Sequence, residues 1–218
     1  MTTARLTPGP FVSGVILAAG RSARLGKDRP KQLLVLDGEV LVRRVARTAL
    51  GSRLAEVLVV VGYEAGAVRR ALAGLEVAVI ENPEHARGQS SSVRAGLRCV
   101  ASRASAAMFI PADQPLVSAR LIDRLIAAYG TSGKRIAVPT WAGRRGAPVV
   151  FDRSLFHELE ALRGDTGGRA VLPRYAESII EVPVDDPSEL ADVDTEDDYR
   201  RLVAPPENLI RPSWNESC

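Results

Sequence analysis

Short apolar runs alternate along the chain with longer segments in which apolar residues recur every three or four positions. The short runs are typical of strands buried on both faces, and the longer segments are typical of amphipathic helices. The alternation predicts βαβ units and a largely parallel sheet. The expected order is strand 12–19, helix 40–50, strand 57–61, helix 64–73, strand 77–80, helix 91–100, strand 107–111 and a helix that Ser118 caps and that runs to 129.

The pattern changes after Lys134. Apolar runs at 136–139 and 148–151 are joined by the turn-rich segment 141–146, which favours a hairpin or an antiparallel excursion over a crossover. A helix at 154–162, a strand at 178–182 and a last helix capped by Thr195 complete the prediction. We expect a single α/β domain with its core at about 11–203 and a loosely held, flexible tail at 204–218.

Composition narrows the class of protein. Of 218 residues, 46% are apolar and 25% are charged, which is ordinary for a globular domain and excludes disorder and collagen-like structure. A net charge of +3 is too small to indicate nucleic-acid binding by itself. Two cysteines give neither a disulfide framework nor a zinc spacing. The first ten residues lack the apolar core of a signal peptide and no run reaches membrane-spanning length, so we expect a cytoplasmic protein that binds neither nucleic acid nor membrane.

The segment from Gly20 to Lys31 is a basic loop that follows the first strand, where open α/β sheets bind ligands. It is not a P-loop, because five residues separate Gly20 from Gly26 and Asp28 stands where a hydroxyl should bind magnesium. The chain also lacks a GxGxxG fingerprint. Arg24 and Lys31 are suited to hold phosphate oxygens. From these residues alone, a polyphosphate site and a solvated basic loop are equally open.

Asp113 comes directly after a buried strand and beside the basic loop. A carboxylate there is suited to Mg²⁺, which uses one or two protein carboxylates together with water and phosphate oxygens. An Asp before Pro115 is equally suited to cap a turn.

Two polar loops follow other strands and helices. In 82–92, three serines stand at a helix start, where they can cap it or bind a sugar or phosphate, and Gly88 permits close backbone approach. The segment 164–169 is either part of an acceptor pocket or a pair of helix caps. Among the acids at 192–198, Asp192 or Asp194 is placed to reach a second metal. Local spacing shows no Ser-His-Asp, Cys-His or paired-glutamate arrangement, which disfavours hydrolases.

Taken together, these segments resemble the molybdenum cofactor nucleotidyltransferases, and most closely the molybdenum cofactor cytidylyltransferase group. The resemblance departs in two places. The family usually has Gly-x-Pro-Lys-Gln, so 27–29 contains a two-residue insertion, and Ala147 stands where the family often has His. The matching segments are LAAGRSARLG at 17–26, PKQLL at 30–34, GQSSSVRAGL at 88–97, DQPLV at 113–117, GAPVVF at 146–151, GDTGGR at 164–169 and DVDTEDD at 192–198.

The resemblance implies a three-layer α/β/α sandwich with a mostly parallel, Rossmann-like sheet. It implies an Mg²⁺-dependent enzyme that transfers CMP from CTP to the phosphate of molybdenum-molybdopterin and releases pyrophosphate. Transient contact with molybdoenzymes is a further expectation. The expected residues are Arg24, Lys31 and Asp113 for catalysis; Leu17, Ala18, Ala19, Gly20, Arg24, Lys31, Asn82, Gly88 and Ser91 for the nucleotide; Asp165 and Arg169 for the acceptor; and Asp113 with Asp194 for the metal.

Three alternatives stay open. The donor is GTP rather than CTP, the acceptor is a sugar or polyol phosphate, or the chain is a catalytically silent protein that delivers molybdopterin. The presence of Arg24, Lys31 and Asp113 together disfavours the silent protein, because delivery has no evident need for all three.

Overall fold

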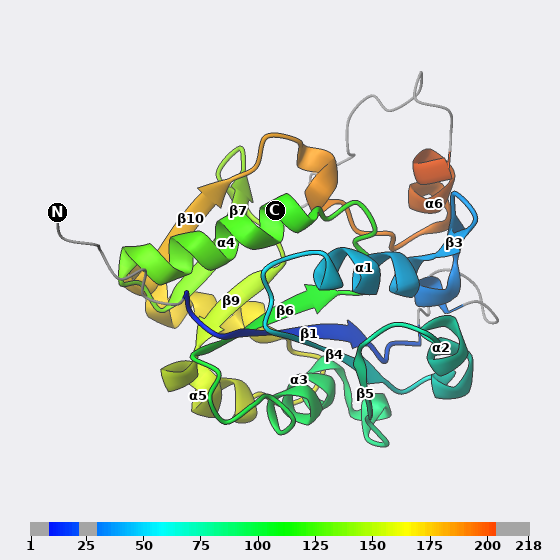
Figure 1. The fold of residues 1–218 in the computed structure, drawn as a ribbon, viewed down its shortest axis with the longest axis horizontal. Coiled ribbons are helices and arrows are strands. Elements are labelled where there is room, and N and C mark those ends of the chain that lie inside the picture. The colour runs from blue at the N-terminus through cyan, green and yellow to red at the C-terminus, as the bar shows by residue number, and fades with distance from the viewer. Residues whose placement is uncertain (1–8, 22–29, 204–218) are drawn as a thin grey trace, which may run out of the picture.

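The computed structural model describes residues 9–21 and 30–203. Its centre is one sheet in the order β10-β7-β9-β6-β1-β4-β5, with β8 paired to β7 (Figure 1). The strands are β1 (Val12–Ala18), β4 (Glu56–Val61), β5 (Ala78–Glu81), β6 (Ala106–Pro111), β7 (Ile136–Trp141), β8 (Arg144–Arg145), β9 (Val149–Asp152) and β10 (Ile179–Pro183).

β1 lies at the centre of the parallel part of the sheet. Ile16 pairs with Val59 of β4 on one side and with Ile110 of β6 on the other. Val12, Val15 and Ile16 are fully buried, as an apolar run covered on both faces requires. Because β5, β4, β1 and β6 all run in the same direction, the loops that follow them gather at one edge of the sheet.

Helices form a layer on each face of the sheet (Figure 1). The helices α1 (Leu41–Leu50), α2 (Ala65–Ala71) and α4 (Ala119–Ser132) share one apolar core with the sheet. The helices α3 (Gln89–Leu97) and α5 (Phe156–Glu160) share a second core. The expected three-layer α/β/α fold with a mostly parallel sheet is therefore confirmed.

The excursion after Lys134 is antiparallel, as the turn-rich sequence predicts. β9 runs antiparallel to β6, with Phe109 opposite Val149, and antiparallel to β7, with Ile136 opposite Phe151. β10 then adds in parallel to β7 at the end of the sheet. Since β9 starts where β6 ends, the segment before Val149 reaches the same edge as the loops of the parallel strands.

Three local features differ from the sequence prediction. Asp37 and Gly38, with φ of 52° and 79°, form a turn between the short strands β2 (Val35–Leu36) and β3 (Glu39–Val40), which the apolar pattern did not indicate. The predicted helix 154–162 is a 3-10 turn, η3 (Arg153–Leu155), followed by the shorter α5. The kinked 3-10 segment η4 (Gly168–Ser178) was not expected.

The capping predictions for two helices are confirmed. Ser118 accepts a hydrogen bond from the Leu121 N–H at 3.0 Å. Before α6 (Glu196–Val203), Thr195 Oγ1 accepts from the Asp198 N–H at 3.1 Å, and Asp198 Oδ2 accepts from the Thr195 N–H at 2.8 Å. This reciprocal pair is a capping box. No described helix is long and apolar enough to cross a bilayer.

Candidate active site

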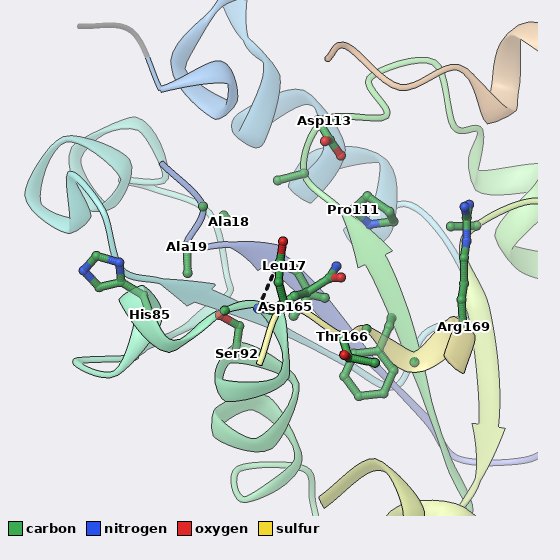
Figure 2. A pocket seen from close by; sticks show the side chains of 18 of the residues that line it. Leu17, Ala18, Ala19, His85, Ser92, Pro111, Asp113, Asp165, Thr166 and Arg169 are labelled. Carbon is green, nitrogen blue, oxygen red and sulfur yellow. Dashed lines mark hydrogen bonds between the residues drawn. The ribbon is translucent and has the colours of Figure 1, made fainter. Parts of the chain in front are cut away.

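A cleft of about 1100 Å³ opens at the edge of the sheet where β1 and β6 end. One wall is formed by the end of β1, the 3-10 turn η1 (Lys31–Leu33) and the start of α3. The other wall is formed by the start of β9 and the glycine-rich segment 165–170. In Figure 2, Asp113 and Arg169 lie on one side, His85 lies on the other, and the end of β1 lies between them.

Three charged side chains meet at one end of this cleft. Lys31 Nζ forms an ion pair with Asp113 Oδ2 and lies 2.7 Å from Asp194 Oδ1. Burial alone would lower the pKa of Lys31, but the two carboxylates raise it above 10.5, so the side chain stays an ammonium. The sequence-predicted catalytic lysine and both predicted metal ligands are therefore in contact, although Asp113 and Asp194 are 81 positions apart in the sequence.

Backbone hydrogen bonds explain how the two carboxylates come together. Asp113 follows β6, and its carbonyl accepts a hydrogen bond from the Val193 N–H at 2.9 Å. That bond places the neighbouring Asp192 and Asp194 beside the end of the strand. The Asp194 N–H in turn donates to Asp198 Oδ2 at 3.2 Å, so the cap of α6 fixes the same loop.

Asp192 is a third acid of the cleft, and Gln114 positions it. Gln114 is fully buried, and its Nε2 donates to Asp192 Oδ1 at 2.8 Å. The Asp192 side chain is exposed to solvent in the cleft, although many protein atoms lie close to it. This environment and the negative charge of Asp113 raise the pKa of Asp192 to about 6, although the bond from Gln114 and the charge of Arg169 oppose the shift.

Gln32 anchors the chain where it leaves β1. Its buried Nε2 lies 3.3 Å from the Ala18 carbonyl oxygen and 3.2 Å from the Gly20 carbonyl oxygen. Leu17, Ala18, Ala19 and Gly20, which the resemblance implies for the nucleotide, line the cleft. Because Gln32 follows Lys31, the anchor also sets the distance between Gly20 and the lysine.

The start of α3 is packed against the glycine-rich segment. Gly88 has φ of 95°, and a Cβ placed on it would lie 2.4 Å from the Gly164 carbonyl carbon. The Ser90 N–H donates to the Gly164 carbonyl oxygen at 3.2 Å, and the Gln89 N–H donates to Asp165 Oδ1 at 3.3 Å. The close approach expected at Gly88 is made by the protein's own backbone. Asp165, not a serine, caps the helix.

Asn82 and Ser91 lie behind the wall of the cleft. The Asn82 Nδ2 donates to Ser91 Oγ at 2.9 Å and to Ser92 Oγ at 3.0 Å, and Ser91 Oγ donates to the Gly88 carbonyl. Of the three serines at 90–92, Ser92 lines the cleft (Figure 2). Gln89 of the same helix also lines it. The buried amide thus supports the loop from behind.

The structure gathers most of the predicted site residues around one cleft. Arg24 and the insertion at 27–29 lie outside the described residues. Gln32 and Gln114 were not predicted as site residues, and Asp192 was named only as the alternative to Asp194 for a second metal, although each lies within a motif that carried the family resemblance. The residues that line the cleft and were predicted are Leu17, Ala18, Ala19, Gly20, Lys31, Gly88, Asp113, Asp165, Arg169 and Asp194.

The donor set suits a hard divalent cation that keeps water and phosphate ligands. Asp113 and Asp194 are both close enough to contact a single ammonium. Within 9–21 and 30–203, no group of three or more His, Cys, Asp or Glu side chains is arranged to enclose a metal. Two carboxylates at an open cleft fit Mg²⁺, which is seldom enclosed by protein ligands alone.

The family model of the MobA-like NTP transferase domain matches residues 14–179. The chain belongs to this family. The match includes Lys31, Asp113 and the glycine-rich segment but ends before Asp194, so the second carboxylate is contributed from outside the matched region. This MobA-like NTP transferase is thus a nucleotidyltransferase by family, which confirms the coarse functional prediction.

Two relatives of nearly equal length match most of the chain. The chain is 32% identical over 201 residues to the purine catabolism protein PucB of Bacillus subtilis, covering 87% of this chain and 95% of the relative. It is 33% identical over 203 residues to the nicotine blue oxidoreductase of Paenarthrobacter nicotinovorans, covering 89% and 97%.

A solved structure shares the fold across the same length. Rv0371c of Mycobacterium tuberculosis matches this MobA-like NTP transferase with a TM-score of 0.75 and 35% identity, over 88% of this chain and 98% of the other. A structure of Rv0371c in complex with manganese matches with a TM-score of 0.73 and 30% identity, over 89% and 98%. A related structure is therefore known in complex with manganese.

Proposed function

We propose that this protein transfers CMP from CTP to the phosphate of molybdenum-molybdopterin, producing molybdopterin cytosine dinucleotide and pyrophosphate. The observation that carries the proposal is the contact of Lys31 with both Asp113 and Asp194 at the end of the strands. A cleft of about 1100 Å³ also leaves room for two substrates side by side. The reaction takes place in the cytoplasm, with transient contact to the molybdoenzymes that receive the product.

The chemistry is an in-line substitution at phosphorus. An oxygen of the acceptor phosphate forms a bond to the α-phosphorus of CTP, and the bond from that phosphorus to the bridging oxygen of the β-phosphate breaks. The product is a phosphoanhydride, and pyrophosphate leaves with the bridging oxygen. Such a reaction depends mainly on positioning and on neutralisation of charge, rather than on a covalent intermediate.

Each wall of the cleft has a separate task in this proposal. The backbone of Leu17 to Gly20, supported by Gln32, holds the nucleoside and the α-phosphate. Lys31 and Arg24 neutralise the triphosphate and the departing pyrophosphate. Across the cleft, Arg169 and the segment beginning at Asp165 contact the acceptor.

Asp113 and Asp194 would hold Mg²⁺, which would supply positive charge to the phosphate oxygens. In the described structure these two carboxylates hold the Lys31 ammonium. A cation at the same oxygens would compensate their charge in its place. The Lys31 side chain would then be available to the triphosphate.

Product analysis tests the proposal directly. The purified protein is incubated with molybdenum cofactor, MgCl₂ and CTP or GTP, and the products are identified by mass. We expect the cytosine dinucleotide and stoichiometric pyrophosphate with CTP, and much less product with GTP. A guanine dinucleotide as the main product would refute the base assignment, and turnover of a sugar or polyol phosphate alone would refute the acceptor.

A silent delivery protein is distinguished by the same assay. Such a protein would bind molybdenum cofactor tightly without releasing pyrophosphate from any of the four nucleoside triphosphates. The ion pairs of Lys31 argue against that role, because binding a finished cofactor does not require an ammonium shared between two carboxylates.

A further inference from the structure

A second cleft, with a volume of about 510 Å³, lies between α3 and the end of α5. It shares Arg87 with the active-site cleft, and its Gly164 contacts Gly88 at the start of α3. The full lining is Arg87, Arg94, Arg98, Glu160, Arg163 and Gly164. Four arginines and one glutamate therefore line the cleft, and no apolar side chain among the described residues does so.

The protein's own hydrogen bonds occupy only part of each arginine. Arg94 Nη1 donates to the Leu162 carbonyl at 2.6 Å and to Ser90 Oγ at 3.3 Å. Arg163 Nη1 donates to the carbonyls of Glu160 and Leu162 at 2.9 and 2.8 Å. Arg has five N–H donors. The Nε and Nη2 donors of both side chains have no partner among the described residues, although each guanidinium is already fixed through Nη1.

Arg98 adds a charge that the described part of the protein does not neutralise. Its exposed guanidinium has no ion pair or hydrogen bond there, and it stands four residues after Arg94 on the same helix face. Like charges at this spacing are unfavourable. The position at the end of α3 offsets some of that cost through the helix dipole. Arg87 is neutralised in part, since it pairs with Glu84 at 2.6 Å.

We propose that this four-arginine cleft binds a condensed phosphate, meaning inorganic pyrophosphate or the polyphosphate chain of a nucleotide. The guanidinium groups of Arg94 and Arg163 are held through Nη1 and keep open N–H donors, which can bind phosphate oxygens bidentately. The concave shape and the volume suit a small molecule rather than a flat protein surface. The site is distinct from the Lys31 site, and it does not depend on which nucleotide or acceptor the enzyme uses.

Calorimetry with inorganic tripolyphosphate on the full chain, without metal, tests the proposal. The wild-type protein should show two binding events, because the active-site cleft also takes a polyphosphate. The Arg98→Ala/Arg163→Ala variant should weaken one event by about tenfold or more and leave the other unchanged. Neither residue lines the active-site cleft, so pyrophosphate release from CTP in the absence of added polyphosphate should stay within about twofold of wild type.

A matched control separates a site from general charge. Arg70→Ala/Arg120→Ala removes two exposed arginines of α2 and α4 that do not line this cleft, and it should bind tripolyphosphate like wild type. Arg98→Lys/Arg163→Lys keeps the charge but lacks the bidentate fork, so its affinity should fall between wild type and the alanine variant. Equal loss in the control and the cleft variant would overturn the proposal, because it would indicate unspecific attraction.

Competition experiments identify which compounds bind through their phosphate groups. Pyrophosphate and CTP should both compete for the event that the cleft variant loses, and cytidine should not. The proposal is wrong if wild type binds every phosphate probe only once and the cleft variant loses only the binding of polyglutamate. That result would indicate that the cleft binds an acidic protein surface. Two phosphate sites without any nucleotidyl transfer would refute the proposed function and leave this site standing.

Discussion

Replacement of Lys31 by Ala separates the structural role of this residue from its catalytic role. The ammonium contacts Asp113 and lies 2.7 Å from Asp194 Oδ1, and its removal leaves two carboxylates facing each other. Two unit charges about 4 Å apart interact by about 4 kcal/mol near a protein surface, before desolvation and side-chain entropy are subtracted. Since the Asp194 side chain is 43% exposed, we expect the free energy of unfolding to fall by only about 1–2 kcal/mol.

The expected effect on the reaction is larger. Loss of one group that stabilises developing charge typically lowers turnover by about 100- to 1000-fold, or about 3–4 kcal/mol in the barrier. Urea unfolding would measure the first quantity, and pyrophosphate release with CTP, MgCl₂ and molybdenum cofactor would measure the second. Lys31→Arg serves as control, because it keeps the charge and should retain more activity. A folded Lys31→Ala protein that keeps activity within about threefold of wild type would refute the catalytic assignment.

Three further predictions follow from contacts in the structure. Asp165→Ala should destabilise the protein by about 1 kcal/mol because the cap of α3 is lost, whereas Asp165→Asn should keep the stability. A normal KM for the acceptor in Asp165→Asn would contradict a role of Asp165 in acceptor binding. Gln32→Ala should raise the KM for CTP by about tenfold in steady-state assays and leave the acceptor KM unchanged, because the carbonyls of Ala18 and Gly20 lose their donor. Tyr129→Phe should lower the free energy of unfolding by about 1–2 kcal/mol at neutral pH, because the hydroxyl donates to Asp152 Oδ2 at 2.6 Å. Burial raises the pKa of Asp152, but the bonds from Tyr129 and Ser154 lower it below 3.8 overall. The stabilisation by this hydrogen bond is therefore present above pH 3.8 and is lost as the pH falls through the lowered pKa. Denaturant titrations should show the stabilities of wild type and Tyr129→Phe converging in acid, and a constant difference would contradict the assignment.

The sequence predicts the parts of the fold that depend on local periodicity and on helix ends. The buried run of β1 and the capping residues Ser118 and Thr195 are examples, because the pattern itself contains the physical cause. The hairpin turn at Asp37 and Gly38 is a strong local signal that an apolar-pattern reading missed. The shortened α5 depends on tertiary packing and is not visible in its own sequence.

The sequence indicates candidate site residues better than it indicates the contacts that hold them in place. Lys31, Asp113 and Asp194, which were predicted for one site, are neighbours in the structure because the ends of the strands and the loops that follow them lie at one edge of the sheet. The support that Gln32 and Gln114 give is not predictable from spacing, since both side chains bond to groups that become neighbours only in the folded chain. The same limit explains why Asp165 caps a helix that starts 76 residues earlier.

The bonds from Gln32 to the carbonyls of Ala18 and Gly20 have a consequence for how the basic loop between Gly20 and Lys31 can change in evolution. These bonds hold the two ends of the loop together, so the number of residues between the ends can vary without moving either end. The entropic cost of two more residues in a closed loop of about ten is only about 0.2 kcal/mol. The insertion at 27–29 is therefore compatible with the same relative placement of Gly20 and Lys31. Changes in that segment can add contacts to a substrate with little loss of stability of the fold.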